Sequence, residues 1–225
     1  MTATRPTSTP DFVGYPAARR GIRALLDGRP ALHRHPVPAC PEWTVTDLLA
    51  HLVEIAGRVL GRHGGTVPAA PAPDSTAPEL LDRWDDVGRE LDRRLAQAGG
   101  RSGDLMVMDA FTHELDLCAA LGVAPPAEHV AQAPSLEVLV RGFSGEVTAL
   151  GLPPLRVRST DGLTWTAGEG RPEASVTAPA RDLCRALAGR RSLAQLAAME
   201  WSEAPGPWLP AFGWGPFTPP PSAGA

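Results

Sequence analysis

The sequence predicts an α+β protein, with an antiparallel four-helix bundle followed by a small α+β domain. Before about residue 125, apolar residues recur with the period of a helix in four segments that Gly and Pro separate. After residue 150 the period changes, and short segments alternate apolar and polar residues as strands do. We therefore divide the chain into a helical domain over residues 1–125 and a second domain over residues 126–225.

The first two helices are expected over residues 12–26 and 45–60. The first ends at Gly28, because glycine readily takes the left-handed conformation that closes a helix. The second begins after Thr44, an N-cap residue with Asp47 three positions further on, which is the spacing of a capping box.

The third and fourth helices differ in the share of their surface that is apolar. A Pro/Ala-rich linker over residues 67–78 leads to the third helix, residues 79–98, where a single apolar stripe faces many charges. The fourth helix, residues 104–121, is apolar around nearly its whole circumference. We expect an outer, solvated third helix and a buried fourth helix.

The second domain is predicted to contain a connector, a fifth helix, three strands, two shorter helices and a Pro/Trp-rich tail. The strands are expected at residues 155–158, 163–166 and 174–177, and the helices at 135–150, 179–187 and 192–201.

Composition excludes several classes of function. All 21 basic residues are arginine, the net charge is −4, and neither lysine nor asparagine occurs. This rules out a broadly basic nucleic-acid binder, a Schiff-base lysine and a Walker-type phosphate site. No apolar run approaches the roughly 20 residues that span a bilayer, and residues 1–11 lack the apolar core of a signal peptide, so we expect a cytoplasmic protein that binds no membrane. We expect a monomer or weak dimer, because no long apolar helix face is left over once the bundle is packed.

A polar stripe on the fourth helix is the main candidate site. Asp109, His113 and Asp116 fall within an arc of about 60° on a helix whose other positions are mostly apolar. Asp109 and His113, one turn apart, can hold a cation, and His51 on the second helix is a third ligand candidate. Asp116 is expected to orient an imidazole, and Glu114 to be an exposed or rim carboxylate.

Each of these features has a simpler alternative. An Asp–His pair within a helix is more often a structural hydrogen bond or ion pair than a metal site. Cys40, between two prolines, is a candidate reactive thiol, but a small buried cysteine is the commoner case.

Two motifs resemble a known family. Residues 37–52, VPACPEWTVTDLLAHL, resemble the V-P-x-C-P-x-W-T-V-x-D-L-x-x-H-L signature of the mycothiol-dependent maleylpyruvate isomerase family, within the DinB-like metal-binding bundles. Residues 109–122 are similar to its later motif, and residues 161–165 and 187–191 to its sterol-carrier-like C-terminal domain. The resemblance implies metal ligation by His51, Asp109 and His113, with Asp109 where the family isomerase has glutamate.

The resemblance also implies the chemistry. A divalent metal, with zinc expected, would hold mycothiol as a thiolate. The thiolate would add to the double bond of a small carboxylated electrophile and leave after rotation in an isomerase, or stay attached in a transferase. Arg190 and Arg191 are candidates for binding substrate carboxylates, although they could instead be helix-end charges.

Two other classes of function stay open. One is a non-catalytic small-molecule binding protein in which the Asp109/His113 pair is purely structural. The other is a regulatory protein whose Pro/Trp-rich tail, residues 201–217, forms the contact surface for a partner.

Overall fold

The computed structural model describes residues 11–99 and 103–222. It divides into two compact units, with the division between Pro134 and Ser135. Within the described residues, no helix is long and apolar enough to cross a membrane.

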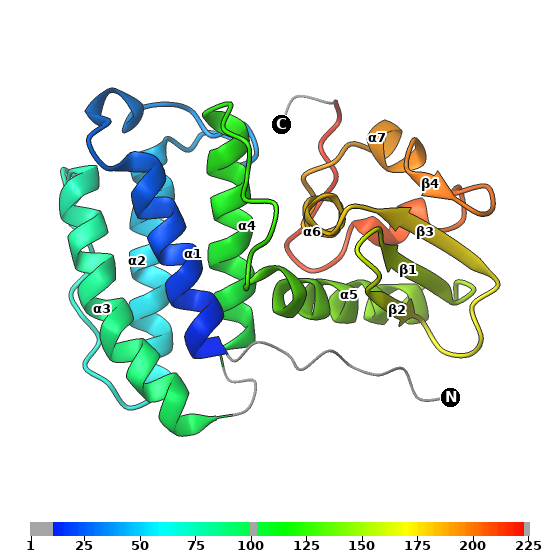
Figure 1. The fold of residues 1–225 in the computed structure, drawn as a ribbon, viewed down its shortest axis with the longest axis horizontal. Helices are drawn as coiled ribbons and strands as arrows, with labels where there is room; N and C mark the ends of the chain where they lie inside the picture. Colours follow the sequence, from blue (N-terminus) through cyan, green and yellow to red (C-terminus); the bar gives the residue numbers. More distant parts are fainter. Residues whose placement is uncertain (1–10, 100–102, 223–225) are drawn as a thin grey trace. The chain divides into compact units, whose positions relative to one another are not determined.

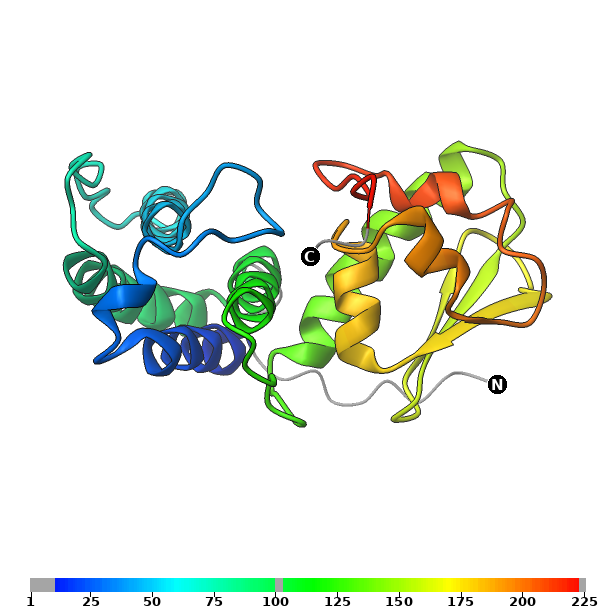
Figure 2. The ribbon, with the colours of Figure 1, turned by 90° about the horizontal axis from the view of Figure 1, so that it is seen from above.

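The first unit is a bundle of helices that run side by side in Figure 1 and are seen nearly end-on in Figure 2. Each helix packs against two others, with α1 and α2 each contacting both α3 and α4. The predicted bundle is confirmed, with these bounds: α1 (Asp11–Leu26), α2 (Val45–Arg62), α3 (Ala77–Ala98) and α4 (Asp104–Ala120), with a short 3₁₀ helix η1 (Pro30–Leu32) after α1.

The helices run antiparallel in two of the four packed pairs, α1 with α3 and α2 with α4. In contrast, α1 and α4 are parallel, since Gly14 faces Val107 and Gly21 faces Glu114, seven residues later on both helices. Helices α2 and α3 are parallel too, and Arg94 near the end of α3 donates to the carbonyl of His63 at the end of α2. The connection over residues 63–76 is long enough to return along the bundle before α3 begins.

Two capping boxes define where α2 and α3 begin. Thr44 and Asp47 exchange side-chain and backbone hydrogen bonds, as the sequence predicted. Thr76 and Glu79 do the same, which starts α3 two residues before the predicted position. Each box satisfies backbone N–H groups that the first turn of a helix leaves without intrahelical partners.

A buried polar network joins α1 to α3. Trp84 Nε1 donates a 2.8 Å hydrogen bond to the Tyr15 hydroxyl, and neither side chain is exposed. Arg19 donates to Asp85 at 3.2 Å and to Asp92 at 2.7 Å, so its buried charge is neutralised. The predicted outer helix α3 is therefore anchored by specific pairing as well as by its apolar stripe.

In the second unit, a mixed β-sheet follows α5 (Gln132–Ala149) along the chain. In the described residues the strand order is β2-β1-β3-β4, with β1 and β3 parallel and the other two pairs antiparallel. The strands and the helices after them are β1 (Leu155–Ser159), β2 (Thr164–Ala167), β3 (Ala174–Ala178), α6 (Ala180–Leu187), α7 (Leu193–Ala197), β4 (Glu200–Trp201) and the 3₁₀ helix η2 (Leu209–Phe212). The α+β class is confirmed.

One predicted helix, residues 192–201, is wrong at its end. Helix α7 stops at Ala197, and Glu200 and Trp201 pair with β3 as the edge strand β4. Pairing with β3 outweighs the local preference for a helix here, because it pairs Val176 and Thr177 on the edge of β3 that does not face β1.

Candidate metal centre

The antiparallel packing of α2 on α4 brings the three predicted ligands together. His51 Nε2 and His113 Nε2 each lie 3.6 Å from Asp109 Oδ1. One donor atom from each residue lies within 4.8 Å of the other two. We call this group, His51, Asp109 and His113, the first ligand set.

The spacing of the first ligand set suits a shared cation better than direct hydrogen bonds. Nitrogen and oxygen ligands about 2.1 Å from a tetrahedral zinc ion lie about 3.4 Å from one another. The observed 3.6 Å is close to that spacing and longer than an ordinary N–H···O bond. His51 and Asp109 also keep 26% and 24% of their side chains exposed, which leaves an approach for a fourth ligand.

Asp116 orients the ring of His113 as expected. Its Oδ2 lies 3.2 Å from His113 Nδ1 and is buried, so Nδ1 donates to it and Nε2 faces the first ligand set. Burial alone lowers the pKa of His113, but the hydrogen bonds with Asp116 and Cys40 and the charge of Asp109 raise it to about 10. The surroundings of this ring therefore favour positive charge.

The loop before α2 places two side chains against the same ring. Its ends are joined by a bridge between Pro36 and Thr44, and Val37 N–H donates to the carbonyl of Trp43 at 2.9 Å. The Trp43 ring lies 5.0 Å from the ring of His51 and 6.2 Å from that of His113, measured between centroids. Cys40 Sγ lies 3.9 Å from His113 Nδ1.

Trp43 was not singled out as a site residue from the sequence, where it stands as one apolar residue in a loop. Its position directly before Thr44, the N-cap of α2, was the available signal that it lies near the site, because His51 stands on α2 about two turns after this N-cap. Only the bend of the loop decides that the indole covers both histidines.

The expectation that Glu114 is exposed is wrong. Glu114 is 2% exposed, and its carboxylate lies against Gly21, where α1 and α4 approach closely because glycine has no Cβ. His129 Nδ1 accepts from Ala131 N–H, so Nε2 carries the proton and lies 3.2 Å from Glu114 Oε2. Burial raises the pKa of Glu114 to about 7.

The two candidate arginines lie after α6 in the second unit. Arg191 Nη2 donates to Asp182 at 2.9 Å, and Arg190 Nη1 donates to the carbonyl of Ala188 at 2.7 Å. Their role in binding a substrate carboxylate stays a prediction.

Comparisons with known proteins agree with this architecture. The family described as "Mycothiol maleylpyruvate isomerase N-terminal domain" matches residues 15–143. Among solved structures, the mycothiol-dependent maleylpyruvate isomerase aligns with a TM-score of 0.58 at 14% identity, over 86% of this chain and 92% of that chain. A histidine-to-alanine mutant of that isomerase aligns with a TM-score of 0.56 at 15% identity, over 87% and 91%. No curated protein matched. At these identities the solved structures establish a shared fold.

Proposed function

The chain belongs to the mycothiol maleylpyruvate isomerase N-terminal domain family, and from this premise we propose that it is a metal- and mycothiol-dependent enzyme. Its reaction is the cis–trans isomerisation of a small, unsaturated carboxylic acid of the maleylpyruvate type. Alternatively, the mycothiol thiolate stays attached to the substrate after it has added to the double bond. The protein is then a thiol S-transferase.

One observation supports the proposal most strongly, namely the convergence of three donor atoms from two helices. His51 and His113 each lie 3.6 Å from the same oxygen of Asp109, a spacing that suits ligands of one cation. A direct hydrogen bond between Asp109 and one histidine would need a shorter separation of about 2.7–3.2 Å. A divalent cation in this set, with zinc expected, supplies Lewis acidity that favours the thiolate form of mycothiol near neutral pH.

The surrounding residues would keep the first ligand set in a fixed geometry. Asp116 accepts a hydrogen bond from Nδ1 of His113, and this directs Nε2 toward the first ligand set. The same hydrogen bond makes Nε2 a stronger metal ligand. Trp43 covers the rings of both histidines and limits the access of water from that side. Asp109 has a shorter side chain than glutamate, and its Oδ1 still lies 3.6 Å from Nε2 of both His51 and His113.

Substrate recognition requires positive charge for the carboxylates, and arginine is the only permanent cation in this chain. Arg190 and Arg191 are our candidates. We expect alanine at either position to raise KM for a dicarboxylate, because a guanidinium binds a carboxylate through paired hydrogen bonds.

The deciding experiment measures metal content and activity on the same preparations. Wild-type protein is expected to retain about one divalent ion per chain and to isomerise maleylpyruvate only when mycothiol is present. His51→Ala is expected to lose both, and His63→Ala, at the end of the same helix outside the first ligand set, to lose neither.

Two results would contradict the proposal. One is wild-type protein that binds no divalent metal; the other is equal mycothiol binding by wild type and His51→Ala in calorimetry. Both are expected of a non-catalytic binding protein with a structural Asp109/His113 pair.

A further inference from the structure

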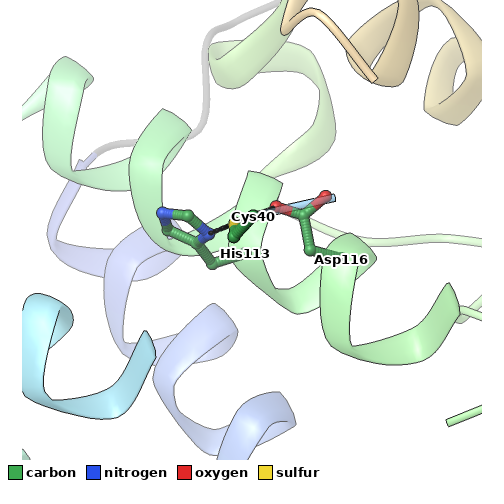
Figure 3. Close-up of side chains that lie close together, drawn as sticks. All are labelled: Cys40, His113 and Asp116. Atoms are coloured by element: carbon green, nitrogen blue, oxygen red, sulfur yellow. Dashed lines mark hydrogen bonds and ion pairs between the residues drawn. The ribbon is translucent and has the colours of Figure 1, made fainter. Parts of the chain in front are cut away.

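A second group of donor atoms lies on the other side of the His113 ring. Figure 3 shows the side chains of Cys40, His113 and Asp116 close together. Cys40 Sγ lies 3.7 Å from Asp116 Oδ2 and 3.9 Å from His113 Nδ1, and Nδ1 lies 3.2 Å from Oδ2. We call this group, Cys40, His113 and Asp116, the second ligand set.

The geometry points to a second metal site at this set, one that takes a soft, thiolate-seeking cation such as Cu⁺, Zn²⁺ or Cd²⁺. It uses the ring nitrogen Nδ1 of His113, whereas the first ligand set uses Nε2. His113 is then a ligand shared between two sets, and Cys40 gives the second set a different metal preference from the first.

The distances fit such a cation. Sulfur about 2.3 Å and nitrogen about 2.0 Å from a tetrahedral zinc ion lie about 3.5 Å from each other. The three separations of 3.2, 3.7 and 3.9 Å require shifts of a few tenths of an ångström to reach that geometry. One donor atom from each residue already lies within 4.8 Å of the others.

The charges and burial also suit a cation. Asp116 is 1% exposed, so its carboxylate lies in a medium where a nearby positive charge is strongly favoured. A Cys40 thiolate and the Asp116 carboxylate together neutralise a divalent ion. On binding, the cation replaces the thiol proton of Cys40 and the Nδ1 proton of His113, and both protons pass to solvent. A sulfur ligand selects soft metals over Mg²⁺ or Ca²⁺.

The loop that carries Cys40 is held in place before any cation binds. Cys40 N–H donates to the carbonyl of Val37 at 2.8 Å, and the carbonyl of Cys40 accepts from Trp43 N–H at 3.0 Å. His35 Nε2 lies 3.0 Å from the carbonyl of Ala120, which fixes the loop to the end of α4. Cys40 is half-buried, in contrast to Cys118 and Cys184, which are buried.

The test titrates Cd²⁺ alone into the full chain and follows the ultraviolet absorption of the sulfur-to-cadmium charge transfer. Wild-type protein is expected to show this band, and its intensity is expected to stop rising once about one equivalent of Cd²⁺ is bound by the second ligand set. The Cys40→Ser variant is expected to lack the band. Asp116→Asn is expected to weaken Cd²⁺ binding roughly tenfold or more. Far-ultraviolet circular dichroism verifies that each variant is folded.

Two matched controls make the result specific. Cys118→Ser removes a buried thiol on α4 outside the set, and His51→Ala removes a ligand of the first set only; both are expected to keep the band. A band of unchanged intensity in Cys40→Ser, no band in the wild type, or loss of the band in His51→Ala would overturn the second site. The titration needs neither mycothiol nor substrate, so it can fail or succeed independently of the proposed enzyme activity.

Discussion

At the scale of single residues, His113 is the point where the features of the site meet. Its ring lies between Asp109 on one side and Asp116 and Cys40 on the other, and it is 6% exposed. Helical spacing alone predicted the Asp109 and Asp116 neighbours, because residues three and four positions apart share a helix face. Cys40 comes from a loop 73 positions away and could not be predicted that way.

Glu114 leads to a prediction about pH. Its carboxyl has an ordinary pKa of 4.5, which burial raises to about 7, so the folded state holds this proton over a range in which the unfolded state has lost it. Stability is fully present below about pH 4.5 and falls as the pH rises toward 7, by at most about 3 kcal/mol.

In Glu114→Gln the fall in unfolding free energy with rising pH is expected to disappear, because the isosteric amide does not titrate. Urea unfolding at pH 5 and pH 8 measures this free energy, and at pH 8 the variant should be more stable than the wild type. An equal loss of unfolding free energy in wild type and Glu114→Gln would show that Glu114 does not keep its proton in the folded state.

At the scale of helices, close approaches depend on glycine. Gly88 of α3 lies against the guanidinium of Arg19, and a Cβ built there would come within 2.2 Å of Nη1. Arg19 cannot move without losing Asp85 and Asp92, both of which it contacts from α1. The pairing of α1 with α3 therefore requires the absence of a side chain at this position.

Gly88→Ala is expected to destabilise the protein by roughly 1–3 kcal/mol, because the added methyl group overpacks the helix interface. Gly145→Ala in α5 is the matched control, because nothing lies within 4 Å of a Cβ there and alanine favours a helix. Thermal unfolding compares the two. A Gly88→Ala variant as stable as the control would mean that Arg19 repacks without cost.

At the scale of the whole molecule, the bundle and the metal proposed for it are expected to stabilise each other. A ligand that binds only the folded state adds about 2.7 kcal/mol at a free concentration one hundred times its dissociation constant. The first ligand set joins α2 to α4, so bound Zn²⁺ is linked to the packing of these helices.

Zn²⁺ is accordingly expected to raise the melting temperature of wild-type protein, and EDTA to reverse the rise, as measured by circular dichroism. His51→Ala should show a smaller response than wild type, because only the second ligand set remains to bind the ion, while His63→Ala should behave as wild type. A Zn²⁺ response of equal size in His51→Ala would show that the stabilising ion binds outside the first ligand set.

The sequence by itself determined the helices, most strand positions and the identity of the family, because these depend on local periodicity, capping residues and a dense motif over residues 37–52. It did not predict the burial of Glu114, the strand β4, or the parallel course of α2 and α3. Those features depend on which surfaces meet in space. A helical wheel gives the direction of a side chain but not what packs against it, and only the tertiary structure brought Trp43 and Cys40 against His113.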